Sequence, residues 1–188
     1  MFSLHEELLE EVTYKGETYK LDMSFDNVLK LQKMIRDPRV SANNKVVVGI
    51  KMLFLEIPDI PIEELVELWR TTFEMVFADD MIEEKKDLKG NIMPTLGKDK
   101  DPIMCMEQDA KHIYSSFMKD YGIDLFEQQG KMHWYKFKAL LYDLSKDTKL
   151  QQIIEIRTCE LPKGKGNQKA RQKMIEAKKH YELKKGDV

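Results

Sequence analysis

Apolar and polar residues alternate along residues 11–22, on both sides of Lys15-Gly16-Glu17. A period of two is typical of β-strands, and a glycine between two such runs favours a tight hairpin turn. An isolated hairpin is only marginally stable in water, so it needs a surface to pack on. We therefore expect a β-hairpin that lies on a helical body or pairs with another chain.

The apolar spacing changes to three and four after residue 22, which indicates helices. Ser24 and Ser41 stand where a helix N-cap is needed, and Pro38 and Pro58 follow the two apolar runs. Pro61 fits the first turn of another helix. We expect three helices here. On the third, apolar residues recur at three- and four-residue spacing: Ile62, Leu65, Val66, Trp69, Phe73 and Val76.

Regular spacing is lost between residues 78 and 102, where charged residues cluster with glycine and proline. Loops of this length are usually either functional or disordered. We expect a mobile surface loop that a partner could order.

Helical spacing resumes at Met106 and stops at Gly122, which suits the left-handed turn that ends a helix. Another helix is expected from residue 125 or 131 to residue 144. Ser145 or Asp147 then stands at the N-cap position of a further helix.

The helix that ends near residue 144 carries an aromatic cluster. Aromatic rings on one helix face usually lie in the core, and we expect Trp134 and Phe137 there. Tyr135 and Lys138 are expected to face outward.

Charge is distributed unevenly along the 188 residues. Residues 163–188 hold nine lysines and arginines against three acidic residues, so this end carries +6 and the remainder carries −8. We expect a mainly α fold: a single helical domain of five or six helices at residues 1–162, which includes the hairpin. A flexible, basic and partly helical tail is expected at residues 163–188.

The composition also bears on location. No apolar run approaches the roughly 18 residues that a membrane span needs, and the acidic N-terminus is unlike a basic signal peptide. Cys105 and Cys159 are far apart, which gives neither a disulfide framework nor a zinc knuckle. These features predict a protein of the reducing cytoplasm.

Residue patterns for catalysis are absent from the sequence. The nine glycines form no phosphate-binding motif, and the four histidines are dispersed without a metal-binding spacing. His133 beside Trp134 could be a general base, although a partly buried or surface histidine explains it as well. We expect no cofactor, no metal and no enzymatic activity.

Binding remains as the expected mode of action. The basic tail has the positive charge that nucleic-acid binding requires. It lacks the interleaved aromatic residues on which the bases of single strands stack, and the negative charge of the rest of the chain opposes such binding. Another polypeptide is the better partner, and a second copy of this chain is left open. The residues expected to bind a partner are Tyr135, Lys138, Tyr142, Lys163, Lys165, Arg171 and Lys173.

One stretch resembles a known family. Tyr121-Gly122-Ile123-Asp124-Leu125 ends one helix, His133-Trp134-Tyr135-Lys136-Phe137 begins another, and Asp147-Thr148 opens a third that holds Ile153, Ile154 and Arg157. This order, with a short lysine-rich end, resembles a family of tailed-bacteriophage proteins encoded near the tape-measure gene in phages and prophages of low-GC Gram-positive bacteria. The resemblance covers residues 110–157 well and the hairpin region loosely. Family members often have tryptophan where this chain has Tyr135.

The resemblance implies a role in tail assembly. By analogy with lambda-type tail-assembly chaperones, the expected partner is the tape-measure protein or another tail protein, in the cytoplasm of the bacterial host. One alternative is a structural head–tail or tail-completion component of the virion. The other is a nucleic-acid-binding regulator that uses the lysine-rich tail.

Overall fold

The computed structural model describes residues 4–77, 103–162 and 167–184. The predicted mobile loop at 78–102 lies outside these residues, as do Lys163 and Lys165. The described residues form two compact units. Unit 1 holds residues 4–77 and 129–138, and unit 2 holds residues 103–128, 139–162 and 167–184. We describe each unit by itself, and the predicted boundary after residue 162 stays a prediction.

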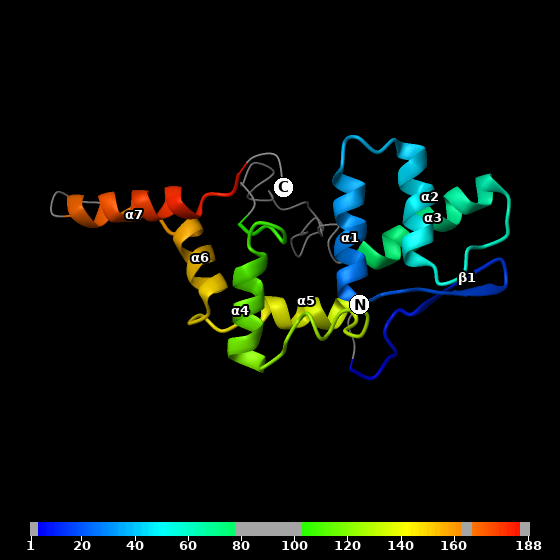
Figure 1. The fold of residues 1–188 in the computed structure, drawn as a ribbon, viewed down its shortest axis with the longest axis horizontal. Helices are drawn as coiled ribbons and strands as arrows, with labels where there is room; N and C mark the ends of the chain where they lie inside the picture. Colours follow the sequence, from blue (N-terminus) through cyan, green and yellow to red (C-terminus); the bar gives the residue numbers. More distant parts are fainter. Residues whose placement is uncertain (1–3, 78–102, 163–166, 185–188) are drawn as a thin grey trace, which may run out of the picture. The chain divides into compact units, whose positions relative to one another are not determined.

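The predicted hairpin is the N-terminal element of unit 1 (Figure 1). Strand β1 (Glu11–Tyr14) pairs antiparallel with β2 (Glu17–Lys20), and Val12 lies opposite Tyr19. Lys15 and Gly16 form the turn with φ angles of 50° and 90°. Two successive positive φ angles suit the right-handed twist of a two-residue hairpin, and glycine adopts such an angle without steric cost.

The hairpin lies on the helices of unit 1, as the alternating pattern predicted. The Tyr14 hydroxyl donates to Glu67 at 2.7 Å, and the Lys15 ammonium pairs with Glu64 at 2.9 Å. At the other end of the hairpin, Leu21 forms an antiparallel bridge with Phe54. The two strands therefore gain from the helical body the support that an isolated hairpin lacks.

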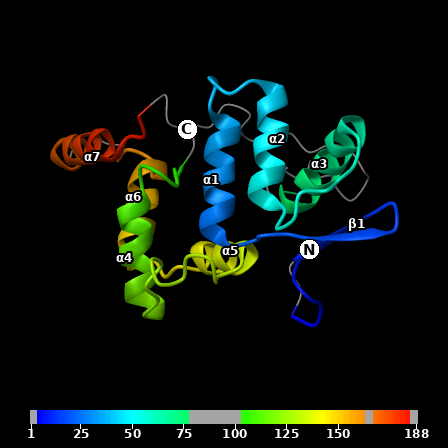
Figure 2. The same cartoon turned by 45° about the vertical axis from the view of Figure 1, so that its right-hand side comes forward.

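Three helices follow the hairpin: α1 (Phe25–Arg36), α2 (Ala42–Leu53) and α3 (Ile62–Phe77). Helices α1 and α2 lie side by side in Figures 1 and 2. Ser41 caps α2 by accepting a hydrogen bond from the Asn44 N–H. Ser24 occupies the N-cap position of α1, but its hydroxyl donates to Asp22 at 2.6 Å instead of capping the helix.

The buried face of α3 differs from the predicted stripe. Ile62 and Val66 are 54% and 47% exposed, so the stripe of apolar residues is not buried along its whole length. Leu68 and Thr72 are fully buried in their place, roughly a third of a turn around the helix. Burial of Thr72 is tolerated because its hydroxyl donates to the Leu68 carbonyl at 2.8 Å.

Unit 2 contains α4 (Ala110–Tyr121) and α6 (Lys149–Thr158), which lie side by side in Figures 1 and 2. Gly122 ends α4 with φ 65°, in the left-handed conformation that was predicted. Helix α5 (Trp134–Tyr142) begins in unit 1 and ends in unit 2. It starts later than the predicted residue 125 or 131.

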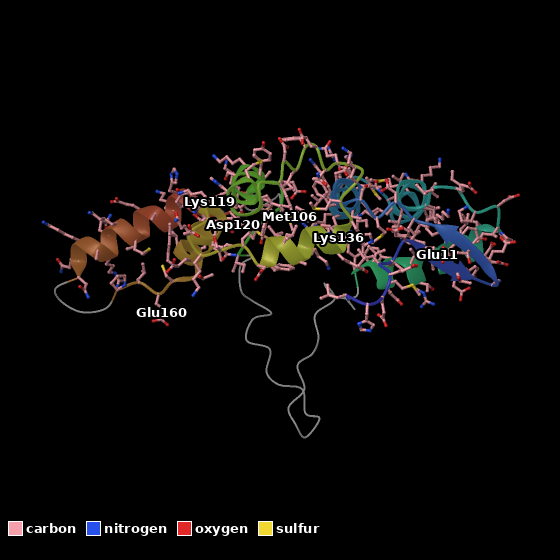
Figure 3. All side chains as sticks on the ribbon, turned by 90° about the horizontal axis from the view of Figure 1, so that it is seen from below. Glu11, Met106, Lys119, Asp120, Lys136 and Glu160 are labelled. Atoms are coloured by element: carbon pink, nitrogen blue, oxygen red, sulfur yellow. The ribbon has the colours of Figure 1, made fainter. Side chains whose placement is uncertain are left out.

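Thr148 caps α6, so the prediction of Ser145 or Asp147 is wrong. The hydroxyl oxygen of Ser145 lies within hydrogen-bond distance of both carboxylates, 2.9 Å from Asp120 and 2.6 Å from Asp147. Asp147 also pairs with Lys119 at 2.6 Å, which with the Ser145 bond lowers the pKa of this carboxyl to about 2. Both predicted caps are thus engaged with the end of α4, where Figure 3 labels Lys119 and Asp120.

The basic tail contains α7 (Gln168–Tyr181), which has no buried residue. With α1–α6, the described residues form seven helices and one two-stranded sheet. The predicted mainly α fold with an N-terminal hairpin is confirmed.

Candidate functional site

Backbone hydrogen bonds join the start of α5 to the start of α1 in unit 1. The Trp134 N–H donates to the Met23 carbonyl at 2.7 Å, and the Phe25 N–H donates to the Met132 carbonyl at 2.9 Å. The rings of Phe25 and Phe137 stack with centroids 4.8 Å apart. Trp134 and Phe137 are 1% exposed, which confirms that they belong to the core.

Tyr135 is half-buried, so it faces outward only in part. Its hydroxyl donates to the Met75 carbonyl at 2.9 Å and to the Val76 carbonyl at 3.4 Å. These carbonyls belong to the last turn of α3 as its bounds are given. Tyr135 therefore connects the end of α3 to α5, and its binding of a partner stays a prediction.

Lys138 is only 6% exposed, so the prediction that it faces outward is wrong. Its ammonium lies 5.5 Å from the centroid of the Trp134 ring and 5.4 Å from that of Tyr135. The two rings precede Lys138 by four and three residues and share its helix face. A lysine stem can fold over such rings and place its charge against their electron-rich faces.

Tyr142 ends α5 and is 66% exposed in unit 2. Arg171 and Lys173 are exposed on α7, also in unit 2. The structure thus brings Tyr135 and Lys138 together, and it places Arg171 and Lys173 on one helix. A partner-binding role for any of these residues stays a prediction.

Arg157 is the centre of a polar cluster in unit 2 that sequence reasoning missed. Its guanidinium bonds to both carboxylate oxygens of Asp109, with distances of 2.7 and 2.8 Å. It also donates to the Tyr181 carbonyl at 2.7 Å and to the Ile103 carbonyl at 2.9 Å. One side chain therefore links the start of α4 and the end of α7 to α6.

Further contacts hold the end of α7 in place. The Lys178 ammonium donates to the Arg157 carbonyl at 2.9 Å, and the Lys149 ammonium lies 5.1 Å from the centroid of the Tyr181 ring. The Gln108 amide donates to the Lys184 carbonyl at 3.0 Å and accepts from the Lys184 N–H at 2.8 Å. The predicted basic tail is consequently anchored near its end. An arginine within the apolar pattern of residues 150–157 was the available signal for this cluster.

His133 lies in unit 1 and is 7% exposed. Its Nδ1 accepts from the Tyr135 N–H at 3.1 Å, so the proton of the neutral ring is on Nε2, which donates to the Leu9 carbonyl at 3.0 Å. Burial lowers the pKa of the ring below its ordinary value. With both nitrogens engaged inside the chain, His133 is placed to hold the segment before β1 against α5.

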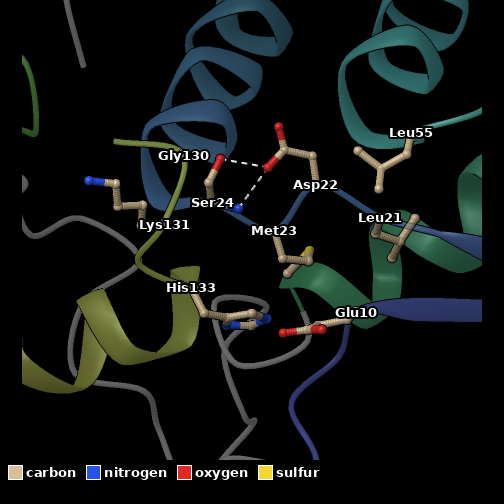
Figure 4. A pocket seen from close by; sticks show the side chains of 9 residues that line it. All are labelled: Glu10, Leu21, Asp22, Met23, Ser24, Leu55, Gly130, Lys131 and His133. Carbon is tan, nitrogen blue, oxygen red and sulfur yellow. Dashed lines mark hydrogen bonds between the residues drawn. The ribbon is translucent and has the colours of Figure 1, made fainter. Parts of the chain in front are cut away.

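Beside His133 is an open hollow of about 370 Å³ (Figure 4). Glu10, Asp22 and Lys131 contribute charged groups to its wall. Asp22 accepts from both the N–H and the hydroxyl of Ser24, at 3.0 and 2.6 Å. The Asp22 carboxylate therefore stabilises the turn before α1 through its two hydrogen bonds with Ser24.

Within residues 4–77, 103–162 and 167–184, no three His, Cys, Asp or Glu side chains are grouped to hold a metal ion. None of the helices in these ranges has the length and apolar character that a bilayer crossing requires.

Comparison with curated proteins gives no match, and comparison with solved structures gives none either. The profile of the bacteriophage Gp15 protein family matches residues 4–183. The resemblance to a bacteriophage family is therefore confirmed at that level. Because the match spans almost the full sequence, this chain belongs to the bacteriophage Gp15 protein family.

Proposed function

We propose that this protein is a non-enzymatic tail-assembly factor that binds the tape-measure protein and shields it until the tail tube forms. Membership of a bacteriophage protein family supports this proposal. The resemblance of residues 110–157, noted from the sequence, to proteins encoded near the tape-measure gene supports it as well. It acts in the cytoplasm of the bacterial host during assembly. Its partners are the tape-measure protein or other tail proteins.

The observation that carries the proposal is an exposed apolar strip on unit 2, made of Tyr114, Met118 and Phe126. Phe126 is 70% exposed and Met118 is 41% exposed. The rings of Tyr114 and Phe126 lie 5.3 Å apart, and Tyr114 and Met118 are one helical turn apart on α4. We call these three residues the α4 strip.

A partner polypeptide is the natural occupant of such a strip. Aromatic side chains and methionine are enriched in protein interfaces, and methionine adapts to differently shaped apolar surfaces. A long helical protein awaiting assembly exposes apolar residues at helical spacing, and the α4 strip covers them reversibly. Arg171 and Lys173 add positive charge for acidic residues of the same partner.

The test is co-expression with the tape-measure protein of the same phage genome, followed by pull-down. The double variant Met118→Ser/Phe126→Ser should recover at least about tenfold less tape-measure protein, because it removes central apolar anchors. Val47→Ser is the matched control, since Val47 is an exposed aliphatic residue of unit 1 at 40% exposure. Equal recovery by all three proteins, each folded by circular dichroism, would reject the α4 strip.

Purified virions separate this function from a structural one. A chaperone is absent from the finished particle, whereas a head–tail or tail-completion component is present at fixed copy number. A nucleic-acid-binding regulator would instead be retained on DNA at low salt and released as salt rises.

A further inference from the structure

The connection between α2 and α3, with the first two turns of α3, leaves four aliphatic side chains in solvent. Leu55 and Ile57 are 63% and 60% exposed, and Ile62 and Val66 are 54% and 47% exposed. Ile62 and Val66 are one turn apart on α3, so they share one helix face. Exposed aliphatic residues so close in sequence are typical of an interaction surface.

The same segment is strongly acidic. Residues 52–69 contain five acidic residues and no lysine or arginine. The hairpin engages two of them, since Glu64 pairs with Lys15 and Glu67 accepts from Tyr14. The side chains of the other three form no hydrogen bond or ion pair with the residues that the structure describes, and all are exposed: Glu56, Asp59 and Glu63. We call residues 55–66 the acidic–apolar surface.

This surface is held in shape before anything binds. The Leu55 N–H donates to the Lys20 carbonyl at 3.0 Å, next to the bridge between Leu21 and Phe54. Pro58 is buried, and Pro61 fixes the backbone before α3. A fixed backbone lowers the entropy that is lost on binding.

Helix α7 carries the opposite charge, and most of its basic side chains are exposed to solvent. It contains five basic residues and one acidic residue. Lys169, Arg171 and Lys173 are exposed, and their side chains have no hydrogen bond or ion pair with any part of the chain that the structure describes. Ile175 is 39% exposed on the same helix. The aliphatic stems of lysine and arginine can cover apolar surface while their charges reach the acidic residues around it.

We propose that α7 of one copy binds the acidic–apolar surface of a second copy. This self-association goes beyond the proposed function, because it needs no other phage protein. Charge complementarity is the reason for choosing α7 as the segment that binds this surface. The chain contains both an acidic segment without basic residues and a basic helix with one acidic residue. A two-fold axis would let each copy donate one α7 and accept one, which closes the assembly as a dimer.

The test is sedimentation velocity of the full chain over a range of protein concentrations. At low salt we expect a dimer whose fraction rises with protein concentration. Salt screens charges that meet at a solvent-exposed interface, so high salt should weaken the dimer about tenfold.

Charge reversal identifies the two surfaces. Lys169→Glu/Lys173→Glu and Glu56→Lys/Glu63→Lys should each weaken the dimer at least about tenfold, because each sets like charges against each other. One chain that carries all four changes should dimerise again, since the two surfaces have then exchanged signs. Lys33→Glu, an exposed reversal on α1, is the matched control and should dimerise like the parent.

Three results would overturn the proposal. The first is a monomer at every concentration and low salt. The second is a dimer that neither of the two charge-reversal variants weakens, or a chain with all four changes that remains monomeric. The third is a salt-dependent change of shape that does not depend on concentration, which would place α7 on its own chain. None of these results depends on the tape-measure protein, so the proposed function would stand or fall separately.

Discussion

The guanidinium of Arg157 meets the carboxylate of Asp109 in a two-point contact, and the two side chains are 11% and 2% exposed. Removing one partner leaves the other charge buried and unpaired. Asp109→Ala should therefore lower the free energy of unfolding by about 3 kcal/mol. The N–H groups of α7 should also exchange faster, because Arg157 holds the Tyr181 carbonyl. Urea denaturation and hydrogen exchange measure the two effects.

The exposed pair of Lys119 and Asp147 is the control for this variant. Its side chains are 48% and 73% exposed, so water already solvates both charges. Lys119→Ala should change the midpoint of urea denaturation little. Equal effects of Lys119→Ala and Asp109→Ala would show that the buried pair has no special role.

His133 should make the stability of the protein depend on pH. Burial lowers the pKa of His133, so the unfolded chain binds a proton at a higher pH than the folded chain. Stability should fall as pH drops below about 6.5, the ordinary histidine pKa, and the loss is complete below the lowered pKa. Protonation would also break the bond that Nδ1 accepts from Tyr135. Urea denaturation on both sides of about pH 6.5 measures the effect.

His133→Gln isolates this contribution, because glutamine does not titrate. The difference in unfolding free energy between parent and variant should narrow as pH falls. His112 also has a pKa lowered by burial, but it is present in both proteins and cancels in the difference. A difference that is constant with pH would contradict the assignment.

Gly49 lies against Trp69 in the contact between α2 and α3. A Cβ atom at Gly49 would collide with the Trp69 indole, whose Cζ2 lies 2.7 Å from the ideal position. Gly49→Ala should therefore lower the free energy of unfolding by about 1–3 kcal/mol, despite the better helix propensity of alanine. Val48→Ala is the neighbouring control, at 37% exposure. Thermal denaturation compares both with the parent, and an unchanged Gly49→Ala would mean that the helices can move apart freely.

Lys138→Glu should destabilise the protein, because it places a negative charge against the faces of Trp134 and Tyr135. We expect a loss of about 2 kcal/mol, whereas Lys138→Arg keeps the cation and should cost less. Lys136→Glu makes the same reversal at an exposed position two residues away (Figure 3). Urea denaturation should rank Lys138→Glu as the least stable of the three.

Local signals in the sequence predicted local structure well. The alternation around Gly16 predicted the hairpin, and Gly122 predicted the end of α4. In each case one residue type and its spacing settle the conformation of a few neighbouring residues.

Structural features that depend on residues far apart in the sequence are harder to predict. The apolar residues of α3 offered more than one stripe, and the choice between Val66 and Leu68 depends on where the packed neighbours lie. A lysine is usually exposed, but the helical period places Lys138 on the same face as Trp134, where it is buried. Asp109 and Arg157 are 48 positions apart, so no spacing rule could have joined them.

The two hydrogen bonds between Gln108 and Lys184 determine the order in which the carboxyl end would detach from unit 2 under mechanical tension. Tension applied at the carboxyl end reaches this pair first, then the bond between Arg157 and the Tyr181 carbonyl, and then the contact of Lys178. These bonds would break one after another, starting from the carboxyl end. The same end would therefore detach under a far smaller force than if all its contacts had to break in a single step.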